Sequence, residues 1–192
     1  MENTYKELIG RLSDLLTRAG YRMATAESCT GGMVGSLCTA VAGSSDWFSG
    51  GIIAYANHVK ERVLGVPAES LEKYGAVSDE VVRHMAVGAL RVCGAQASVV
   101  LSGVAGPGGG SPEKPVGTVW LAVAVENRAD AYRIDLEAVQ RLHPDCARIT
   151  ERDRAIVVAT RYHFAGDRDA VRTQAARTAL RDLADLLALQ HT

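Results

Sequence analysis

The sequence predicts an α/β protein, a three-layer α/β/α sandwich built around a mixed, mostly parallel sheet. Apolar runs typical of buried strands largely alternate with segments of helical periodicity, which favours helices on both faces of one sheet. Two strand-like runs near the C-terminus, 118–125 and 155–164, have no helix of obvious length between them, which indicates a mixed sheet. With 192 residues, the chain can bury the core of a single domain, 1–192.

The first half of the chain supplies the outer helix and the first strands. The first helix has Gly20 just past its end, and its apolar stripe consists of Leu8, Ile9, Leu12, Leu15 and Leu16. Short apolar runs predict the next elements: a strand over 23–26, a tightly packed helix over 31–41, a strand over 52–56 and a short helix over 59–64.

The second half continues the alternation. Ser78 is a good N-cap for a helix over 79–93, which has Asp79 and Glu80 in its first turn. A buried strand over 97–104 runs into a glycine-rich loop that ends near Gly117, ahead of the two strands already named. A long final helix over 167–189 has an apolar face made of Val171, Ala175, Leu180, Leu183, Leu186 and Leu187.

The composition excludes several classes of protein. A formal net charge of -1 argues against a dedicated nucleic-acid binder, which would carry a basic excess or stripe. No apolar stretch of about 18 or more residues and no signal-like start is present, so we expect a cytoplasmic protein that does not contact membranes. Four scattered cysteines without a CxxC pair predict neither a zinc site nor a disulfide framework; they are Cys29, Cys38, Cys93 and Cys146.

The segment 25–32, Thr-Ala-Glu-Ser-Cys-Thr-Gly-Gly, lies at a predicted strand-to-helix junction. Ser28 would sit there beside free amides at the start of a helix, which form an anion or oxyanion site. Gly31 and Gly32 let the backbone approach a ligand closely, and the amides from Thr30 to Gly32 are the expected oxyanion donors. The alternative is that Ser28 or Thr30 is only an N-cap and that the glycines only permit close packing.

A serine nucleophile needs a base, and the chain shows no Ser-His-Asp order. Lys60 follows the predicted strand over 52–56 on the first turn of a short helix. A lysine can act as a base when burial or a cationic neighbour lowers its pKa toward neutrality. The alternative is that Lys60 is a solvated surface charge, and His58 is the rival base.

Two further segments could bind an anion. Residues 102–117 form a loop rich in glycine and proline whose exposed amides can cradle a phosphate, although it is not a Walker A loop. Arg168 and Arg172 would share one face of the final helix and could bind a phosphate together. The alternatives are a plain connecting loop and a solvated charged face.

Taken together, these segments resemble the CinA C-terminal domain family, whose stand-alone members include nicotinamide-nucleotide amidases. The matching stretches follow the family's order and span nearly the whole chain: 26–32, 42–45, 55–60 with 64–66, 75–78, 102–110, 113–118, and 166–168 with Arg172. Each stretch alone is weak evidence, but their common order makes the resemblance specific.

The resemblance implies hydrolysis of nicotinamide mononucleotide to nicotinic acid mononucleotide and ammonia, with no metal and no organic cofactor. It implies that Ser28 is the nucleophile, Lys60 the general base and Tyr55 an orienting group. Arg168 would meet the charge of the substrate, and Arg172 would assist it. The expected partners are the nucleotide substrate and further copies of this chain, in a homodimer or larger homo-oligomer.

If the chain is such an amidase, the glycine-rich loop 102–117 is the expected phosphate-binding element, through Gly103, Gly106 and Gly108. The amides of such a loop can hold the 5′-phosphate of the nucleotide. Its assignment to the phosphate, rather than to the ribose or to the positioning of Ser28, is an interpretation of the loop's composition.

Two features depart from the family pattern. The large N-terminal domain of many members is not found here, which matches the stand-alone form. The polar stretch 127–154 is longer than the usual connection, and Pro144 interrupts any helix in it. This insertion could be an extended β-hairpin tip, an oligomer contact or a lid.

Two other functions remain open at this point. The first is a non-catalytic nucleotide-binding or regulatory module of the competence or damage-inducible type, which would not need both Ser28 and Lys60. The second is an amidase that acts on a different substrate because of the insertion.

Overall fold

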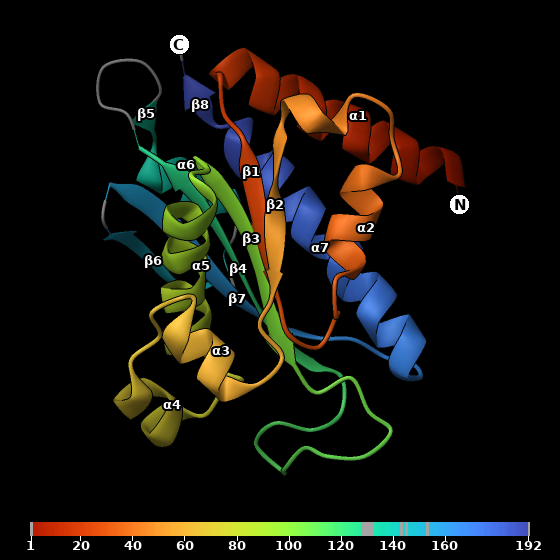
Figure 1. Ribbon diagram of the computed structural model, residues 1–192, viewed down its shortest axis with the longest axis vertical. Helices are drawn as coiled ribbons and strands as arrows, with labels where there is room; N and C mark the ends of the chain where they lie inside the picture. The colour runs from red at the N-terminus through yellow and green to blue at the C-terminus, as the bar shows by residue number, and fades with distance from the viewer. Residues whose placement is uncertain (1, 128–132, 143, 145, 153, 192) are drawn as a thin grey trace.

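The computed structural model describes residues 2–127, 133–142, 144, 146–152 and 154–191. Six strands form one sheet in the order β2-β1-β3-β4-β7-β6 (Figure 1). They are β1 (Met23–Glu27), β2 (Phe48–Ile53), β3 (Ala97–Gly103), β4 (Thr118–Glu126), β6 (Cys146–Arg152) and β7 (Ala155–His163). A separate two-stranded ladder joins β5 (Arg133–Ile134) to β8 (Gln190–His191).

Helices cover both faces of the sheet. They are α1 (Glu2–Ala19), α2 (Met33–Thr39), α3 (Asn57–Arg62), α4 (Ala68–Tyr74), α5 (Asp79–Cys93), α6 (Leu136–Leu142) and α7 (Arg168–Leu187), with a 3₁₀ turn over Ser44–Asp46. Helices α1, α2 and α7 pack on one face, and α5 packs on the other with α3 and α4 at its end (Figure 1). The prediction of a three-layer α/β/α sandwich is therefore confirmed.

The sheet is mixed, as predicted, but it is not mostly parallel. Strand β1 runs parallel to β2 and β3, whereas the pairs β3–β4, β4–β7 and β6–β7 are antiparallel. The expected predominance of parallel pairs is wrong because β3 and β4, and again β6 and β7, are neighbours both in the chain and in the sheet. Strands joined without a crossover helix pair antiparallel.

The core consists of two clusters, one on each side of the sheet. In β3, Val99 and Leu101 belong to the cluster under α1 and α7, whereas Val100 belongs to the cluster under α5. Side chains alternate between the two faces of a strand, and a sheet covered on both faces has apolar residues at both sets of positions. This explains why the central strands appear in the sequence as nearly continuous apolar runs.

Helix α5 packs closely against the chain after α3, at Gly88. A Cβ atom at Gly88 would lie 2.1 Å from the carbonyl oxygen of Leu64, so Gly88→Ala forces the backbone to shift. We expect this substitution to lower the free energy of unfolding by about 1–3 kcal/mol, the usual cost of overpacking, in urea denaturation. In the control Gly10→Ala, the added methyl group meets nothing within 4 Å on an exposed face of α1, and stability should rise slightly. Equal stability of the two variants would contradict the close packing.

The largest local differences from prediction occur at β2 and after β4. Strand β2 covers Phe48–Ile53 rather than 52–56, because Gly50 and Gly51 interrupt the apolar pattern that marks a strand. Helix α4 was not predicted, and neither were the helix and the strands within the insertion, α6, β5 and β6.

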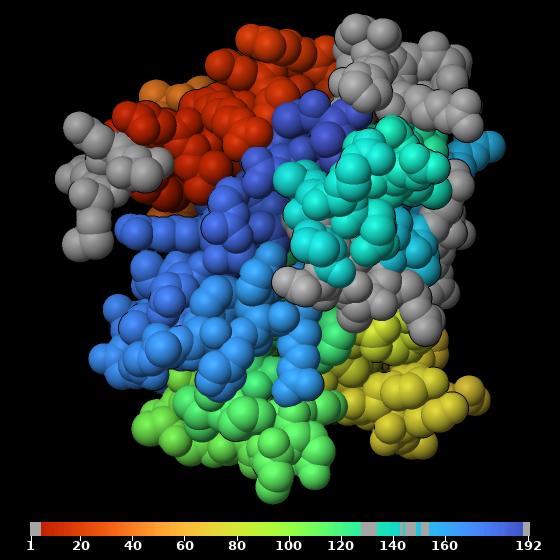
Figure 2. Space-filling model, turned by 180° about the vertical axis from the view of Figure 1, so that it is seen from behind, coloured from red at the N-terminus to blue at the C-terminus, as the bar shows by residue number. Residues whose placement is uncertain are grey.

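The described residues of the insertion pack onto the core: β5 pairs with β8 after the end of α7, and β6 pairs with β7 at the edge of the sheet. Ile134 and Val139 are buried in the cluster that contains α1 and α7. Residues 133–142 (teal) lie beside the C-terminal part of α7, whereas the glycine loop (green) lies at the opposite end of the molecule (Figure 2). Helix α7 has 20 residues and spans about 30 Å between these ends. The described residues of the insertion thus add the edge strand β6 and the short helix α6 to the fold, and its role as a lid or an oligomer contact stays a prediction.

Candidate active site

The candidate site lies at one edge of the sheet, where four strands end. Strands β1, β2 and β3 are parallel, and β7 runs in the same direction as β3 because each of them pairs antiparallel with β4. Ser28 follows β1, and Lys60 lies on α3 after β2. The glycine loop follows β3, and Arg168 opens α7 after β7. The carboxyl ends of such strands are the usual place for a ligand in an open α/β sheet.

Ser28 and Lys60 are brought together by this arrangement. The Lys60 Nζ atom lies 3.4 Å from Ser28 Oγ, and it donates hydrogen bonds to the carbonyl oxygens of Ala54 (2.7 Å) and Tyr55 (3.0 Å). Lys60 is only 1% exposed, so the alternative of a solvated surface lysine is wrong. Burial lowers the pKa of Lys60, and the nearby Cys29 opposes that shift to a smaller degree. His58 is exposed, and no hydrogen bond to Ser28 is found for it among the described residues.

Ser28 is not a helix cap. Helix α2 begins at Met33, and its N-cap is Gly32, in the left-handed region with φ 96°. The Ser28 amide donates to the carbonyl oxygen of Leu101 on β3 at 3.0 Å, which fixes the serine at the end of the sheet. The half-buried hydroxyl of Ser28 therefore has no capping role.

The amides of Gly31 and Gly32 already have partners within the protein. Gly31 donates to the Ser28 carbonyl oxygen at 3.1 Å, and Gly32 donates to the Glu27 carboxylate at 3.0 Å. The prediction that these two amides stabilise an oxyanion does not fit this geometry, because both already donate to groups of the protein. The sequence did not reveal that the Glu27 carboxylate accepts from the amides at the start of α2. No hydrogen bond to another residue is found for the amides of Cys29 and Thr30 within the described residues.

Arg168 connects three parts of the site. Its guanidinium donates to the carbonyl oxygen of Gly106 in the glycine loop (2.9 Å) and to the hydroxyl of Tyr55 (3.3 Å). Tyr55 is 60% exposed and Arg168 is also exposed, so both side chains face the open side of the site. This pair can meet a bound anionic or aromatic group directly.

Arg172 contacts the loop 28–32, which follows β1, rather than the open side of the site. It donates to the carbonyl oxygen of Thr30 at 2.9 Å and forms an ion pair with Asp169 at 3.7 Å. Thr30 is fully buried, and its hydroxyl is without a partner among the described groups, as is the Nε atom of Arg172. Arg172 therefore stabilises the loop that follows Ser28.

The glycines of the loop after β3 differ in their surroundings. A Cβ atom at Gly103 would lie 2.6 Å from the Thr118 carbonyl oxygen, so this glycine serves the packing of β3 on β4. Gly106 has φ +83°, and a Cβ atom there would lie 2.6 Å from a methyl group of Val116. Gly108 is open, because a Cβ atom there would have nothing within 4 Å.

A cavity of about 400 Å³ lies between the glycine loop and the start of α7, and it is lined by Ala105, Pro107, Val116, Gly166, Asp167, Arg168 and Asp169. Most of this lining is apolar, and its charged groups are two carboxylates and one guanidinium. A cavity of this kind suits the uncharged part of a small ligand better than a phosphate.

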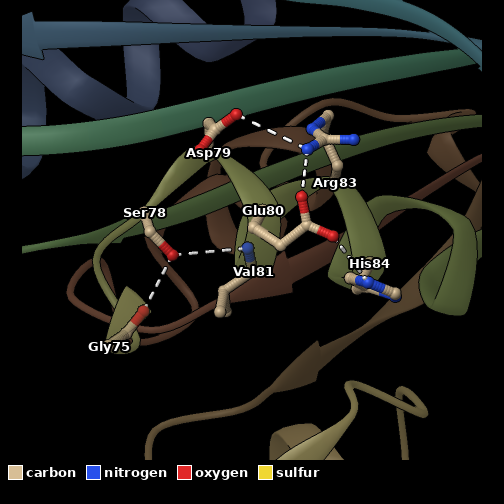
Figure 3. A network of polar contacts seen from close by, with 7 residues as sticks. All are labelled: Gly75, Ser78, Asp79, Glu80, Val81, Arg83 and His84. Atoms are coloured by element: carbon tan, nitrogen blue, oxygen red, sulfur yellow. Dashed lines mark hydrogen bonds and ion pairs between the residues drawn. The ribbon is translucent and has the colours of Figure 1, made fainter. Parts of the chain in front are cut away.

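A polar network lies at the start of α5 (Figure 3). Ser78 caps the helix as predicted: its hydroxyl accepts from the Val81 amide at 3.4 Å and donates to the Gly75 carbonyl oxygen at 2.8 Å. The buried Arg83 pairs with Asp79 and Glu80, and Glu80 also contacts His84 at 3.2 Å. Arg83 and His84 contribute to lowering the pKa of the Glu80 carboxyl, against the effect of burial. The network stabilises the start of α5. The buried position of Arg83 was not predicted, because the hydrophobic periodicity of α5 does not indicate a buried arginine.

Other sites are not indicated in the described part of the chain. No group of three or more His, Cys, Asp or Glu side chains there could hold a metal ion. Cys29, Cys38 and Cys93 are free thiols, and burial raises the pKa of Cys29 to about 11. None of the helices within the described ranges is long and apolar enough to cross a membrane.

The fold and the site define an α/β/α protein with a serine and a buried lysine at the carboxyl end of its sheet. Residues 5–144 match the family profile of the CinA C-terminal domain, and the chain belongs to this family.

Relatives and solved structures agree with this membership. The chain is 40% identical over 185 residues to the nicotinamide-nucleotide amidohydrolase PncC of Enterobacter agglomerans, covering 94% of this chain and 96% of that protein. It is 53% identical over 148 residues to a CinA-like protein of Anaeromyxobacter dehalogenans, covering 73% of this chain but only 36% of that longer protein. A crystal structure of a CinA superfamily protein from Klebsiella pneumoniae superposes with a TM-score of 0.77 at 33% identity, covering 96% and 98% of the two chains.

Proposed function

We propose that this protein hydrolyses the carboxamide of nicotinamide mononucleotide, producing nicotinic acid mononucleotide and ammonia. The observation that carries the proposal is the 3.4 Å approach of the buried Lys60 Nζ to Ser28 Oγ. The activity after which the Enterobacter relative is named supports the choice of substrate, since the two chains are 40% identical over nearly their whole length.

In the proposed mechanism, Lys60 acts as the general base in its neutral form. Its two N–H groups donate to the carbonyl oxygens of Ala54 and Tyr55, which leaves the lone pair directed at Ser28. Ser28 Oγ attacks the carboxamide carbon while Lys60 accepts the hydroxyl proton. The Cys29 amide is the proposed oxyanion donor, and one such donor typically contributes about 2.7–4 kcal/mol.

The second half of the reaction reverses the role of Lys60. Its ammonium form protonates the departing nitrogen, so ammonia leaves and the acyl group remains on Ser28 Oγ as an ester. Water then attacks this ester and gives its proton to Lys60, and Ser28 Oγ leaves with a proton as the acid is released. Lys60 returns to its neutral form at the end of the cycle.

The substrate is proposed to meet Tyr55 and Arg168 at the open side of the site. Arg168 Nη2 donates to the Tyr55 hydroxyl, so the two side chains can orient a bound nucleotide together and Arg168 can pair with its phosphate. The apolar cavity beside Arg168 is proposed to take an uncharged part of the nucleotide. Thr30 and Arg172 act through the shape of the loop 28–32, and Gly106 and Gly108 are proposed to lie beside the bound substrate.

Replacing Arg168 by alanine should weaken substrate binding more than chemistry. We expect KM for nicotinamide mononucleotide to rise by about 10- to 100-fold, since a hydrogen bond to a charged group is worth about 1.5–3 kcal/mol, and kcat to change much less. Steady-state kinetics of ammonia release measure both constants. The control Arg177→Ala removes another arginine of α7. An unchanged KM in Arg168→Ala would contradict the role of Arg168.

One experiment separates the amidase from the other functions. Ammonia release is compared between nicotinamide mononucleotide, free nicotinamide and other small amides, for the wild-type protein and Ser28→Ala. Activity on the nucleotide that depends on Ser28 supports the proposal, and activity confined to another amide indicates a different substrate. No release from any amide, with wild-type and variant alike in every assay, would indicate a regulatory nucleotide-binding module.

We further propose that residues 1–192 act as one domain, in the cytoplasm, as a homodimer or larger assembly and without metal or cofactor. The free thiols of Cys29, Cys38 and Cys93 are compatible with a reducing compartment. Strand β2 lies at the edge of the sheet, and Ile53 at its end is a large, exposed hydrophobic residue that a second copy could cover. Light scattering of the purified protein tests the assembly state.

A further inference from the structure

Glu27 is a buried carboxylate next to the proposed nucleophile. It is the last residue of β1, it directly precedes Ser28, and it is 1% exposed. An unpaired buried carboxylate is costly, so the groups that satisfy it show what it does in the fold. In this structure those groups are backbone amides of the next helix.

The Glu27 side chain holds the start of α2. One carboxylate oxygen accepts from the amides of Gly32 (3.0 Å) and Val34 (3.1 Å), and the other accepts from Gly35 (2.9 Å). These amides would otherwise be unsatisfied at the positive end of the helix, where a carboxylate is favoured. Both ends of the loop 28–32 are therefore attached to Glu27, the first through the chain and the second through its side chain.

The main chain of Glu27 extends this connection to the base. The Glu27 carbonyl oxygen accepts from the Ala54 amide at 2.8 Å, and the Ala54 carbonyl oxygen accepts from Lys60 Nζ at 2.7 Å. A shift of Glu27 would therefore change the position of Ser28 and that of Lys60 together.

Glu27 is not placed to exchange protons with a substrate. Its two oxygens are occupied by three amides, and the observed partners of Lys60 Nζ are Ser28, Ala54 and Tyr55. A carboxylate that accepts three backbone hydrogen bonds is held in place by them. Its role must therefore be exerted through the residues that it holds.

We propose that Glu27 is the positioning residue of the site, whose carboxylate fixes the loop 28–32 so that Ser28 Oγ faces Lys60 and the Cys29 amide faces the reacting carbonyl. The catalytic part of this inference depends on the proposed amidase function. The structural part, the attachment of the loop to α2, does not.

The test replaces Glu27 by glutamine, which keeps the size of the side chain but removes its charge and turns an N–H₂ group toward amide donors. We expect kcat for nicotinamide mononucleotide to fall by about 10- to 100-fold with KM within about twofold, as for a small misplacement of reacting groups. Hydrogen–deuterium exchange should be about tenfold faster at residues 32–35 and unchanged in β3 and α7, because a charge-assisted hydrogen bond is lost locally.

Two further variants complete the experiment. Glu72→Gln, an exposed glutamate on α4, is the matched control and should leave kinetics and exchange unchanged. Glu27→Asp keeps the charge but shortens its reach, so it should give intermediate values of kcat and exchange, and it replaces Glu27→Gln if that variant does not fold.

The outcomes decide between the parts of the proposal. Normal kcat together with normal exchange at residues 32–35 in Glu27→Gln overturns it, and faster exchange with normal kcat overturns the positioning of Ser28. If the wild-type protein releases no ammonia, the proposed function has failed, and the exchange data alone support or overturn the attachment of the loop by Glu27.

Discussion

Replacing Ser28 by alanine is expected to reduce kcat for ammonia release by about 10⁴- to 10⁶-fold, the range seen when a serine nucleophile is removed. In the proposed mechanism, the Ser28 hydroxyl is the group that forms the covalent bond to the substrate. The backbone of Ser28 is held by the carbonyl oxygen of Leu101, so the variant should keep its melting temperature. A coupled assay of ammonia release, with substrate well above KM, measures the loss.

Ser36→Ala provides the matched control for this prediction. Ser36 is an exposed serine on α2, a short distance along the chain from Ser28, and the structure gives it no part in the site. Its activity should equal that of the wild-type protein. If Ser28→Ala keeps a substantial fraction of kcat, another group is the nucleophile and the proposed mechanism is wrong.

Replacing Lys60 by methionine should lower kcat by about 10²- to 10⁴-fold, the usual contribution of a general base. Burial lowers the pKa of Lys60, so the neutral amine becomes available closer to neutral pH than for a solvated lysine. In the wild-type protein, kcat/KM should rise with pH through this pKa as Lys60 loses its proton. The residual activity of Lys60→Met should not show this rise.

Lys60 should also leave a signature in the pH dependence of stability. Its pKa is lower in the folded than in the unfolded protein, so between the two values the unfolded chain binds one more proton. The free energy of unfolding of the wild-type protein should therefore increase with pH across this window. Urea denaturation at several pH values should show the increase in the wild-type protein and a smaller one in Lys60→Met.

Lys60→Arg separates the base from the positive charge. Arginine keeps the charge but does not become neutral in this range, so this variant should be as inactive as Lys60→Met. Wild-type turnover in Lys60→Arg would show that the cation, and not the base, is what the reaction needs at this position.

The fold could be predicted well where burial on both faces left continuous apolar runs. Strands β3, β4 and β7 were placed within a few residues, because their positions are apolar on both sides. Strand β2 was misplaced because Gly50 and Gly51 have no side chain, so this stretch lacks the apolar pattern that indicates a buried strand. The share of parallel pairs was overestimated because hydrophobic periodicity does not reveal which consecutive strands pair directly, as β3 with β4 and β6 with β7 do.

The candidate site was predictable in its residue types but not in its distances. The position of Ser28 and Lys60 after two strands indicated that they could meet, but only the register between β1 and β2 brings them together. The role of Glu27 was missed because its partners are backbone amides, which any sequence supplies. The composition of the glycine loop suggested a phosphate cradle, but it did not distinguish Gly103, which packs against β4, from Gly108, which is open.

The length of α7 has a practical consequence for work on this protein. Its first residue, Arg168, belongs to the site, while its last turn lies beside the small β5–β8 ladder, about 30 Å away. A fluorescent dye or an affinity handle attached near Gln190 would therefore stay clear of a bound nucleotide. Surface immobilisation through that end should leave the entrance facing the solution, which suits binding measurements with small ligands.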